Sequence, residues 1–568
     1  MHEYVVVLVS ILANNLLGLN GETLGPKKVD EETDFKKLVQ RGTPMVDKSL
    51  LIKEFMDDPK NTIVVARPRG FGKSINLSMM KHFLTVNGTS ESLFNNLAIA
   101  RDVDFCKMHQ NKHPVIHLNF ASLRGETLDE CKRQLTISIN NLYLQHHYLG
   151  QSSRLSEAER KNFTASYSGS VADTHVPLLI SKLMRLMRIH YGQKIIVLLE
   201  DYDIPIWSAY SKYFQMDMYD LLRGVIENIF NDESLLKGMI LGVTSEGKNI
   251  FSGLKNKGIY TVRHDKYSEY FGFLETEVKQ LTTDYKISKL NILKELKDHY
   301  GGYKIGNKTI VYNSWSLTSC LKDGAKLGNN WLKSFDSPEV LNPIIMTYGV
   351  VPPLKVEMLL LGVDIRIVFE PDYSVHEELF TNEDKFWTFL VQLGFFTIIH
   401  QEKNNRSEIL CDLRIPNREI RSAMVFAIKG YETKYKVARY KEFLDCFKRN
   451  DSSKAQIILD SYVKNSALFF FDHRLDRVAS LFKGLESVYG PSGTITDKDD
   501  YYLLELNPGK PEPFLLLLIR AESFDDIKPA ASLIKSLEKN EIIHFKLFVH
   551  FPPDKEIFDQ LKHPQKEP

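Results

Sequence analysis

The sequence contains little cysteine and almost no excess charge of either sign. Its 568 residues include five cysteines, none of them in a CxxC pair or at another spacing typical of a metal site. The odd number allows at most two internal disulfides, and the wide separation of the cysteines leaves their pairing open. With 73 basic and 72 acidic residues, the formal net charge is +1, so overall charge favours neither a nucleic acid nor an acidic substrate as a partner.

The sequence also lacks an apolar run long enough to span a membrane. The run from Val5 to Ala13 is too short to cross a bilayer, but it has the length of a signal peptide core. No Lys or Arg precedes it, whereas Gly18 and Gly21 offer cleavage points before a polar segment. We expect residues 1–21 to be a signal peptide and the protein to be secreted without a membrane span. A buried N-terminal strand, or a start assigned too early, is the alternative, and the protein would then be intracellular.

Secretion would make the N-x-[ST] sequons relevant, so a glycoprotein is expected. One of them, Asn76, falls in a predicted helix, and we expect it to carry no sugar if that helix packs inside. The six sequons are Asn76, Asn87, Asn162, Asn307, Asn405 and Asn450.

The most informative stretch begins with the apolar run 63–66, which predicts a buried strand. The loop 67–72 follows, and Lys73 and Ser74 then open a periodic apolar segment that predicts a helix. A strand, a glycine-containing loop ending in Gly-Lys-Ser, and a helix form the layout of a phosphate-binding P-loop. Its backbone N–H groups would cradle phosphates, Lys73 would reach the β- and γ-phosphates, and Ser74 would ligate Mg²⁺.

Two positions depart from the P-loop pattern. Arg67 stands where the pattern has its first glycine, and Gly70 is an additional glycine. On spacing alone, a strand–turn–helix with an incidental Gly-Lys-Ser stays open as an alternative.

The segment 67–80 resembles the RPRRFGKSLNLSML segment of the AAA-ATPase-like proteins. These are P-loop ATPases, common in bacteria and usually fused to a C-terminal PD-(D/E)XK nuclease-like domain. In that family Arg67 is the rule, whereas Gly70 takes the place of a second Arg. The resemblance implies a nucleotide-binding loop made of Arg67, Pro68, Arg69, Gly70, Phe71, Gly72, Lys73 and Ser74.

A second apolar run, 195–199, ends in Glu200 and Asp201. Open α/β sheets bind ligands at the carboxyl ends of such buried parallel strands. In this Walker B pattern, one acid serves Mg²⁺ and the next serves the attacking water. The segment looks like the family's LIDEYDTPI with the two acids exchanged, so Glu200 takes the Mg²⁺ side together with Ser74, and Asp201 is the catalytic candidate.

The exchange predicts slow or vestigial ATP hydrolysis. Glu200 is one methylene longer than the family's Asp and would crowd the ion or bend, and Asp201 is one methylene shorter than the family's Glu. A misplacement near 1 Å costs roughly a hundredfold in rate. Both charges survive, so we expect ATP and Mg²⁺ to bind.

A further departure lies after the predicted strand 238–244. The family reads TGILRIAKESIFSGLNN here, and residues 250–254 match its end, but the family's Arg is missing. Because this Arg follows a core strand, where a phosphate sensor would sit, its absence is a second indication of slow hydrolysis.

Other blocks extend the resemblance from about residue 35 to 421. Asp47 and Lys48 match the family's YVDKT lead-in, and we interpret them as a solvated turn without a chemical role. Blocks similar to YSEYFGFTEEEV, WYDGY and YNPWS are interpreted as aromatic packing, also without a catalytic role, and two later blocks resemble FWSLLxxLGYLT and IPNxEI. In this order the blocks lie at 267–278, 299–303, 312–316, 386–397 and 415–420.

The predicted fold is α/β, with ordinary hydrophobic and charged fractions of 43% and 26%. We expect a P-loop NTPase core with a parallel sheet at 35–290. A helix-rich lid region would follow at 291–430, with a β-hairpin at 393–398 and 409–413. The last part, 431–568, suits a small α/β domain that resembles a degenerate PD-(D/E)XK nuclease.

Nuclease chemistry needs an Asp that opens one strand and Glu-x-Lys on the next strand, so that two carboxylates hold Mg²⁺. The predicted strands are 501–506 and 514–519, and Asp500 could supply the first acid. Residues 518–520 read Leu-Ile-Arg in place of Glu-x-Lys, so we expect no nuclease activity.

The sequence thus favours a secreted AAA-ATPase-like protein that binds ATP with Mg²⁺. The alternative is a secreted interaction or effector protein that uses the fold as a scaffold for an unidentified protein partner, without a nucleotide. Scarce extracellular ATP favours that alternative if the protein is secreted. An active ATP-dependent nuclease would require the missing Glu-x-Lys, and nucleic acid is not an expected partner.

Overall fold

The computed structural model describes seven segments and four further strands between 493 and 550. The segments are 33–88, 90–168, 176–209, 214–245, 250–331, 362–370 and 382–424, apart from a few isolated positions. The chain divides into two compact units, one formed by 1–351 and 358–427 and the other by 352–357 and 428–568. The expected signal peptide lies outside the described residues. No helix in the described part is long and apolar enough to cross a membrane.

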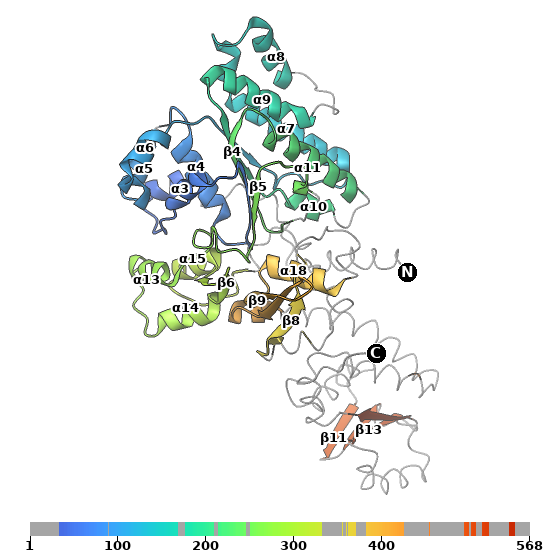
Figure 1. The fold of residues 1–568 in the computed structure, drawn as a ribbon. Helices are drawn as coiled ribbons and strands as arrows, with labels where there is room; N and C mark the ends of the chain where they lie inside the picture. Colours follow the sequence, from blue (N-terminus) through green and yellow to red (C-terminus); the bar gives the residue numbers. More distant parts are fainter. Residues whose placement is uncertain are drawn as a thin grey trace. The chain divides into compact units, whose positions relative to one another are not determined.

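The first unit is built on a five-stranded sheet in which every neighbouring pair is parallel (Figure 1). The strand order is β2-β3-β4-β1-β5. All residues of β1 and β3 are buried, as expected for strands covered by helices on both faces. The predicted α/β fold with a parallel sheet is therefore confirmed. The strands are β1 (Thr62–Ala66), β2 (Val115–Asn119), β3 (Ile195–Glu200), β4 (Leu235–Gly242) and β5 (Lys257–Tyr260).

Helices cover both faces of this sheet (Figure 1). On one side lie α3 (Leu50–Asp57), α4 (Lys73–Leu84), α5 (Glu91–Phe94) and α6 (Val103–His109). On the other side lie α7 (Leu128–Gln145), α9 (Val176–Tyr191), α10 (Ile204–Ala209) and α11 (Gln215–Phe230). The short α2 (Phe35–Gln40) packs on α4, and α8 (Glu157–Ser168) packs on α7 and α9.

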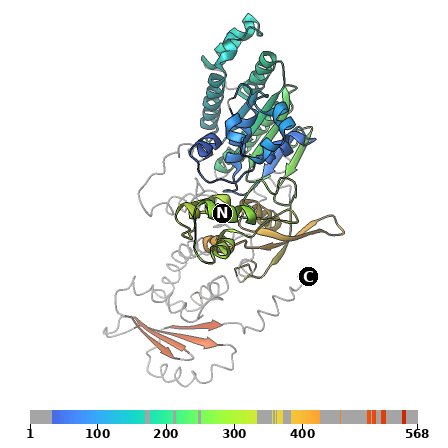
Figure 2. The same cartoon turned by 90° about the vertical axis from the view of Figure 1, so that its left-hand side faces the viewer.

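The part of the first unit that follows β5 consists of helices and short strands. A cluster of buried apolar side chains joins the first three of these helices. Figure 2 shows the last two strands as a projecting hairpin. The elements are α13 (Glu275–Asp284), α14 (Ile292–Tyr300), β6 (Tyr303–Ile305), β7 (Thr309–Val311), α15 (Ser314–Lys322), β8 (Ile365–Val368), α18 (Glu383–Leu393), β9 (Thr397–Lys403) and β10 (Ile409–Arg414).

The predicted β-hairpin exists, but its first strand begins later than expected. Leu393 is the last residue of α18, and Gly394 ends that helix with φ of +95°, a left-handed conformation typical of a glycine C-cap. The run of buried residues in α18 continues the helix through the first residue assigned to the strand, so β9 starts only at Thr397.

The interpretation of Asp47 and Lys48 as a solvated turn is wrong for Lys48, which is buried, whereas Asp47 is exposed. Lys48 is only 8% exposed, and its Nζ donates to the carboxylate of Glu277 at 2.7 Å. Asp47 accepts a hydrogen bond from the backbone N–H of Ala98 at 2.6 Å. The two side chains tie the start of α3 to α13 and to the segment before α6. Removing one partner of the largely buried Lys48–Glu277 pair costs about 3–5 kcal/mol, which gives Lys48 a structural role.

The second unit contains a four-stranded sheet in the order β11-β12-β13-β14. The first two pairings are antiparallel and the last is parallel. The predicted pairing of 501–506 with 514–519 is confirmed, whereas β11 was not predicted because its sequence, GTITDK, has a single large apolar residue. Asp500 lies outside the described residues, and the nuclease-like fold stays a prediction. The strands are β11 (Gly493–Lys498), β12 (Tyr501–Leu506), β13 (Phe514–Ala521) and β14 (Phe545–His550).

Candidate functional site

The predicted strand–loop–helix is present at the carboxyl end of β1. The loop 67–72 contains two glycines in left-handed conformations, Gly70 with φ of +80° and Gly72 with φ of +78°, which glycine adopts without a steric penalty. Gly72 is the N-cap of α4, so the loop leads directly into a helix N-terminus. Unpaired N–H groups and the helix dipole make such an end favourable for an anion.

Lys73 turns back onto the loop that precedes it. Its Nζ donates to the backbone carbonyls of Arg67 and Pro68, both at 3.0 Å. Burial lowers the pKa of Lys73 to about 8, and the negative charges of Asp201 and Asp203 oppose that shift. Protonated at neutral pH, the ammonium is held by neutral carbonyls, and phosphate oxygens would be stronger acceptors at the same place.

Ser74 and Glu200 meet between α4 and the end of β3, as the sequence predicted. Ser74 Oγ donates to Glu200 Oε1, and Asn119 Nδ2 donates to Glu200 Oε2 at 3.3 Å. His117 Nε2 lies 3.9 Å from the same Oε2. Burial first, and the neighbouring Asp201 second, raise the pKa of Glu200 to about 8. The charge of this carboxylate is therefore poorly compensated by the protein, and a bound cation would stabilise it.

The oxygen atoms of Ser74 and Glu200 fit Mg²⁺ by type. Mg²⁺ is a hard cation that is usually held by one or two protein oxygen ligands, substrate phosphates and water. A hydroxyl and a carboxylate already in contact at the N-terminus of α4 match that requirement.

Asp201 follows β3 with a left-handed backbone, φ of +55°. Its backbone N–H donates to the carbonyl of Leu241 at 2.9 Å, which holds the residue at the sheet edge. Burial raises the pKa of the Asp201 carboxyl, and the positive charges of Lys73 and Arg69 oppose this. Asp is enriched several-fold among non-glycine residues with positive φ. The backbone therefore favours the shorter acid at this position, which the sequence alone did not show.

The side chain of Arg67 faces the interior. It is fully buried, and its guanidinium donates to the carbonyls of Ala66 at 2.9 Å and Tyr260 at 3.1 Å. It also lies over the ring of Phe271 at 5.8 Å. Burial lowers the pKa of Arg67 to about 9, so the group is charged at neutral pH. The guanidinium fixes the loop to the end of β5, and the contribution of Arg67 to the site is its backbone carbonyl, which binds Lys73.

Pro68 and Phe71 support the loop through packing. A Cβ placed on Gly394 would come within 2.8 Å of Pro68 Cβ, so the end of α18 lies directly on that proline. Phe71 is buried, and its ring meets the ring of Tyr303 edge-on at 5.0 Å between centroids. The side chains of both residues pack against α18 and Tyr303 and support the loop. Only their backbone atoms are left for the predicted nucleotide binding.

The sequence analysis missed the residues that brace the tip of the loop. Asn313 Nδ2 donates to the carbonyl of Arg69, and the backbone N–H of Trp315 donates to the carbonyl of Gly70, both at 2.9 Å. These residues belong to the YNPWS-like block, which was assigned to packing alone. The match of Asn313 and Trp315 to that family block was the available signal.

A second group missed from the sequence lies at the end of β4. Gln392 of α18 is buried, accepts from the backbone N–H of Ser245 and donates to its hydroxyl, both at 2.8 Å. Asp203 accepts from the backbone N–H groups of Val243 and Thr244, each at 2.8 Å. The end of β4 is thus bonded to a neutral glutamine, and the Arg that the family has after this strand is missing.

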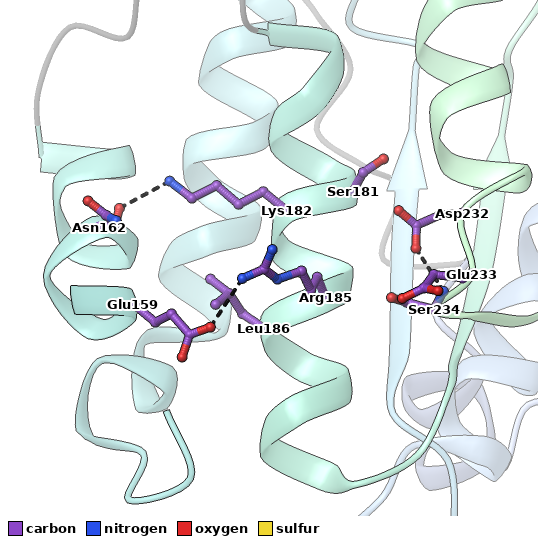
Figure 3. A pocket seen from close by; sticks show the side chains of 9 residues that line it. All are labelled: Glu159, Asn162, Ser181, Lys182, Arg185, Leu186, Asp232, Glu233 and Ser234. Carbon is purple, nitrogen blue, oxygen red and sulfur yellow. Dashed lines mark hydrogen bonds and ion pairs between the residues drawn. The ribbon is translucent and has the colours of Figure 1, made fainter. Parts of the chain in front are cut away.

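A cavity of about 400 Å³ lies elsewhere, between α8, α9 and the turn before β4 (Figure 3). Because that turn precedes β4, the cavity is at the amino ends of the parallel strands, opposite the loop 67–72. Its basic side chains are engaged: Lys182 bonds to the carbonyl of Asn162, and Arg185 pairs with Glu159 at 3.2 Å. None of the predicted site residues lines it.

The raised pKa of Glu200 predicts a pH-dependent stability difference between the native protein and Glu200→Gln. Between the ordinary carboxyl pKa of 4.5 and the folded value of about 8, the native state holds a proton that the unfolded state has released. This bound proton stabilises the folded form of the unmutated protein at low pH. Its free energy of unfolding therefore falls as the pH rises toward the folded pKa. We compare the free energy of unfolding of Glu200→Gln with that of the unmutated protein, measured by denaturant unfolding. From pH 5 to pH 7.5 the difference should shift in favour of Glu200→Gln by at least about 1 kcal/mol. An unchanged difference across that range would contradict the burial of an uncompensated carboxylate.

Comparisons with known proteins agree with this site. Residues 32–250 match the model of the family described as "Predicted AAA-ATPase", which confirms the resemblance over β1 to β4, the loop and both acids. No protein with a curated description matches the sequence. The match does not extend to the second unit. Together, the family match and the loop geometry support nucleotide binding.

Two solved structures are similar to the chain at low identity. A Walker-type ATPase of Pyrococcus abyssi shares 13% identity, with 71% of this chain and 99% of that chain covered and a TM-score of 0.34. The ORC2 protein of Aeropyrum pernix, solved in ADPNP–ADP complexes, shares 12% identity, with 72% and 97% covered and a TM-score of 0.23.

Proposed function

We propose that the first unit binds ATP with Mg²⁺ at the loop 67–74 and hydrolyses it slowly. The observation that carries the proposal is the contact between Ser74, at the start of α4, and Glu200, at the end of β3. It places a hydroxyl and a carboxylate together beside Lys73, at the edge of a parallel sheet where ligands bind. The family match over 32–250 supports the same proposal.

Each residue has a distinct task in this proposal. The backbone N–H groups of the loop and of the first turn of α4 bind the phosphates. Lys73 would exchange its loop carbonyls for phosphate oxygens, and Ser74 and Glu200 would hold Mg²⁺, whose charge would offset that of the phosphates. Asp201 would accept a hydrogen bond from the attacking water and orient it.

Two features support a slow rate. Asp201 is shorter than the family's Glu and is tied to a left-handed backbone, so its carboxylate reaches less far toward the water. The family's Arg after β4 is missing, and the end of β4 is bonded instead to the neutral Gln392 through Ser245. A missing charge of this kind removes electrostatic stabilisation from the transition state.

The second candidate is a scaffold that uses no nucleotide. The observation in its favour is that Lys73 already has two acceptors within the loop, Arg67 and Pro68. Isothermal titration with ATP and ADP, each with and without Mg²⁺, separates the two functions. Mg²⁺-dependent binding supports the ATPase proposal. If no heat of binding is measured up to millimolar nucleotide, the scaffold function is favoured.

For the second unit we propose a domain that does not cleave nucleic acid and contacts a protein partner. The supporting observation is the sequence of β13, FLLLLIRA, which contains no acidic residue. A digestion assay on DNA and RNA with Mg²⁺ or Mn²⁺ should show no cleavage, and cleavage lost in Asp500→Ala would refute the proposal. Secretion with removal of residues 1–21 is proposed from the sequence alone, and mass spectrometry of the mature N-terminus tests it.

A further inference from the structure

We propose that Asn313 is a positioning residue of the nucleotide site, which aims the N–H groups of the loop at the phosphates from outside the sheet core. The inference rests on the proposed nucleotide binding and adds a residue that lies 244 positions from its loop partner, Arg69.

Both ends of the side-chain amide of Asn313 are bonded, which fixes its orientation. Its Nδ2 donates to the carbonyl of Arg69 at 2.9 Å, and its Oδ1 accepts from the backbone N–H of Ser316 at 3.0 Å, as the N-cap of α15. A rotated amide would place its oxygen against a carbonyl and its nitrogen against an N–H group. The residue is completely buried, so water does not compete for either bond.

The position of Asn313 is fixed by the surrounding structure. Its backbone N–H donates to the carbonyl of Tyr300, the last residue of α14, at 3.2 Å. The preceding residue, Tyr312, exchanges two backbone hydrogen bonds with Phe273 at 2.8 and 3.1 Å. The amide is therefore held by elements that do not belong to the loop, and its bond to Arg69 can fix the loop's conformation.

The loop fits closely around this amide. Gly70 has φ of +80°, and a Cβ at this position would lie 2.5 Å from Asn313 Oδ1. The carbonyl of Gly70 accepts from the backbone N–H of Trp315 at 2.9 Å. Two consecutive loop carbonyls, those of Arg69 and Gly70, are thus held by the start of α15.

The direction of these two carbonyls determines the direction of the next two N–H groups. In a trans peptide the C=O and the following N–H lie in one plane and point to opposite sides. A carbonyl of Arg69 held by Asn313 turns the N–H of Gly70 away from α15. A carbonyl of Gly70 held by Trp315 does the same for the N–H of Phe71. Without the Asn313 amide, the peptide between Arg69 and Gly70 can rotate, and one phosphate donor is lost.

The decisive experiment removes the amide donor and keeps the helix cap. Asn313→Ser retains a good N-cap acceptor, and Asn313→Asp retains the cap with the original shape. Neither side chain can donate to Arg69 as the amide does. The matched controls are Asn382→Ser and Asn382→Asp, because Asn382 caps α18 through the same type of bond, to Lys385 at 3.0 Å.

We expect both Asn313 variants to weaken binding of ATP–Mg²⁺ and ADP–Mg²⁺ by about tenfold, as for loss of a buried hydrogen bond. Both Asn382 variants should keep the native Kd. The serine variant separates loss of the donor from the added charge of the aspartate variant. Without nucleotide, Asn313→Ser should lower the melting temperature more than Asn382→Ser, because Asn313 is buried and also loses its bond to Arg69, whereas Asn382 is exposed and keeps its cap.

The outcomes distinguish the inference from the proposed function. In one outcome the unmutated protein binds nucleotide, Lys73→Ala loses binding, and Asn313→Ser keeps the native Kd. This result overturns the role of Asn313 and leaves the proposed function standing. A native protein that binds no nucleotide overturns the proposed function and this inference with it. A fall in melting temperature confined to Asn313→Ser, without a change in Kd, would make the residue purely structural and also overturns the inference.

Discussion

Replacing Lys73 with alanine should abolish the rise in melting temperature that ATP with Mg²⁺ gives the native protein. A ligand that binds only the folded state at a hundred times its Kd stabilises it by about 2.7 kcal/mol. Lys73 is a buried cation at the end of the loop, and its Nζ donates to two loop carbonyls. Without the ammonium the phosphates lose their nearest positive charge. Differential scanning fluorimetry with and without ATP–Mg²⁺ measures the effect.

A lysine of the same helix provides the control for this experiment. Lys81 lies in the last turn of α4, two turns beyond Ser74, and Lys81→Ala removes the same charge from the same element. Its nucleotide-induced shift should equal that of the native protein. An equal shift in Lys73→Ala would sink the assignment of the loop as a phosphate site.

The buried core of the fold could be predicted from the sequence because its strands are parallel and covered on both faces. Such strands are uninterrupted apolar runs, which is why β1 and β3 were located to within a residue. The strand β11 was missed because it carries only one large apolar residue. Its assignment depends on pairing with β12, and a pairing is not a local property of the chain.

The candidate site was predictable only where its chemistry is local. Lys73, Ser74 and the two acids follow from spacing along short segments, and the structure brings them together. The bond from Asn313 to Arg69 joins residues 244 positions apart, and no periodicity signals it. The burial of Lys48 could not be predicted for the same reason, since its partner Glu277 lies 229 residues away in the sequence. Long-range polar contacts of this kind become visible only in the folded chain.

Exchanging the two acids, Glu200→Asp with Asp201→Glu, should raise the rate of ATP hydrolysis by about tenfold or more. The shorter acid at 200 relieves crowding at Mg²⁺, and the longer acid at 201 reaches the attacking water. The geometry adds a cost, because Glu at 201 would have to adopt φ of +55°, a strain of about 1 kcal/mol or more. The melting temperature of the exchanged protein should therefore fall while its turnover rises, as measured by phosphate release.

The single variants assign the two effects to their positions. Of the two single variants, Asp201→Glu should lower the melting temperature, because it places the longer side chain at the left-handed residue. Glu200→Asp alone introduces no left-handed strain, so any fall in its melting temperature without nucleotide should come only from the buried methylene that is removed beside Ser74. If hydrolysis requires the correct acid at both positions, neither single change should reach the rate of the double change. Equal rates in the native and doubly exchanged proteins would show that water positioning by these acids does not limit turnover, and would direct attention to the neutral Gln392 at the end of β4.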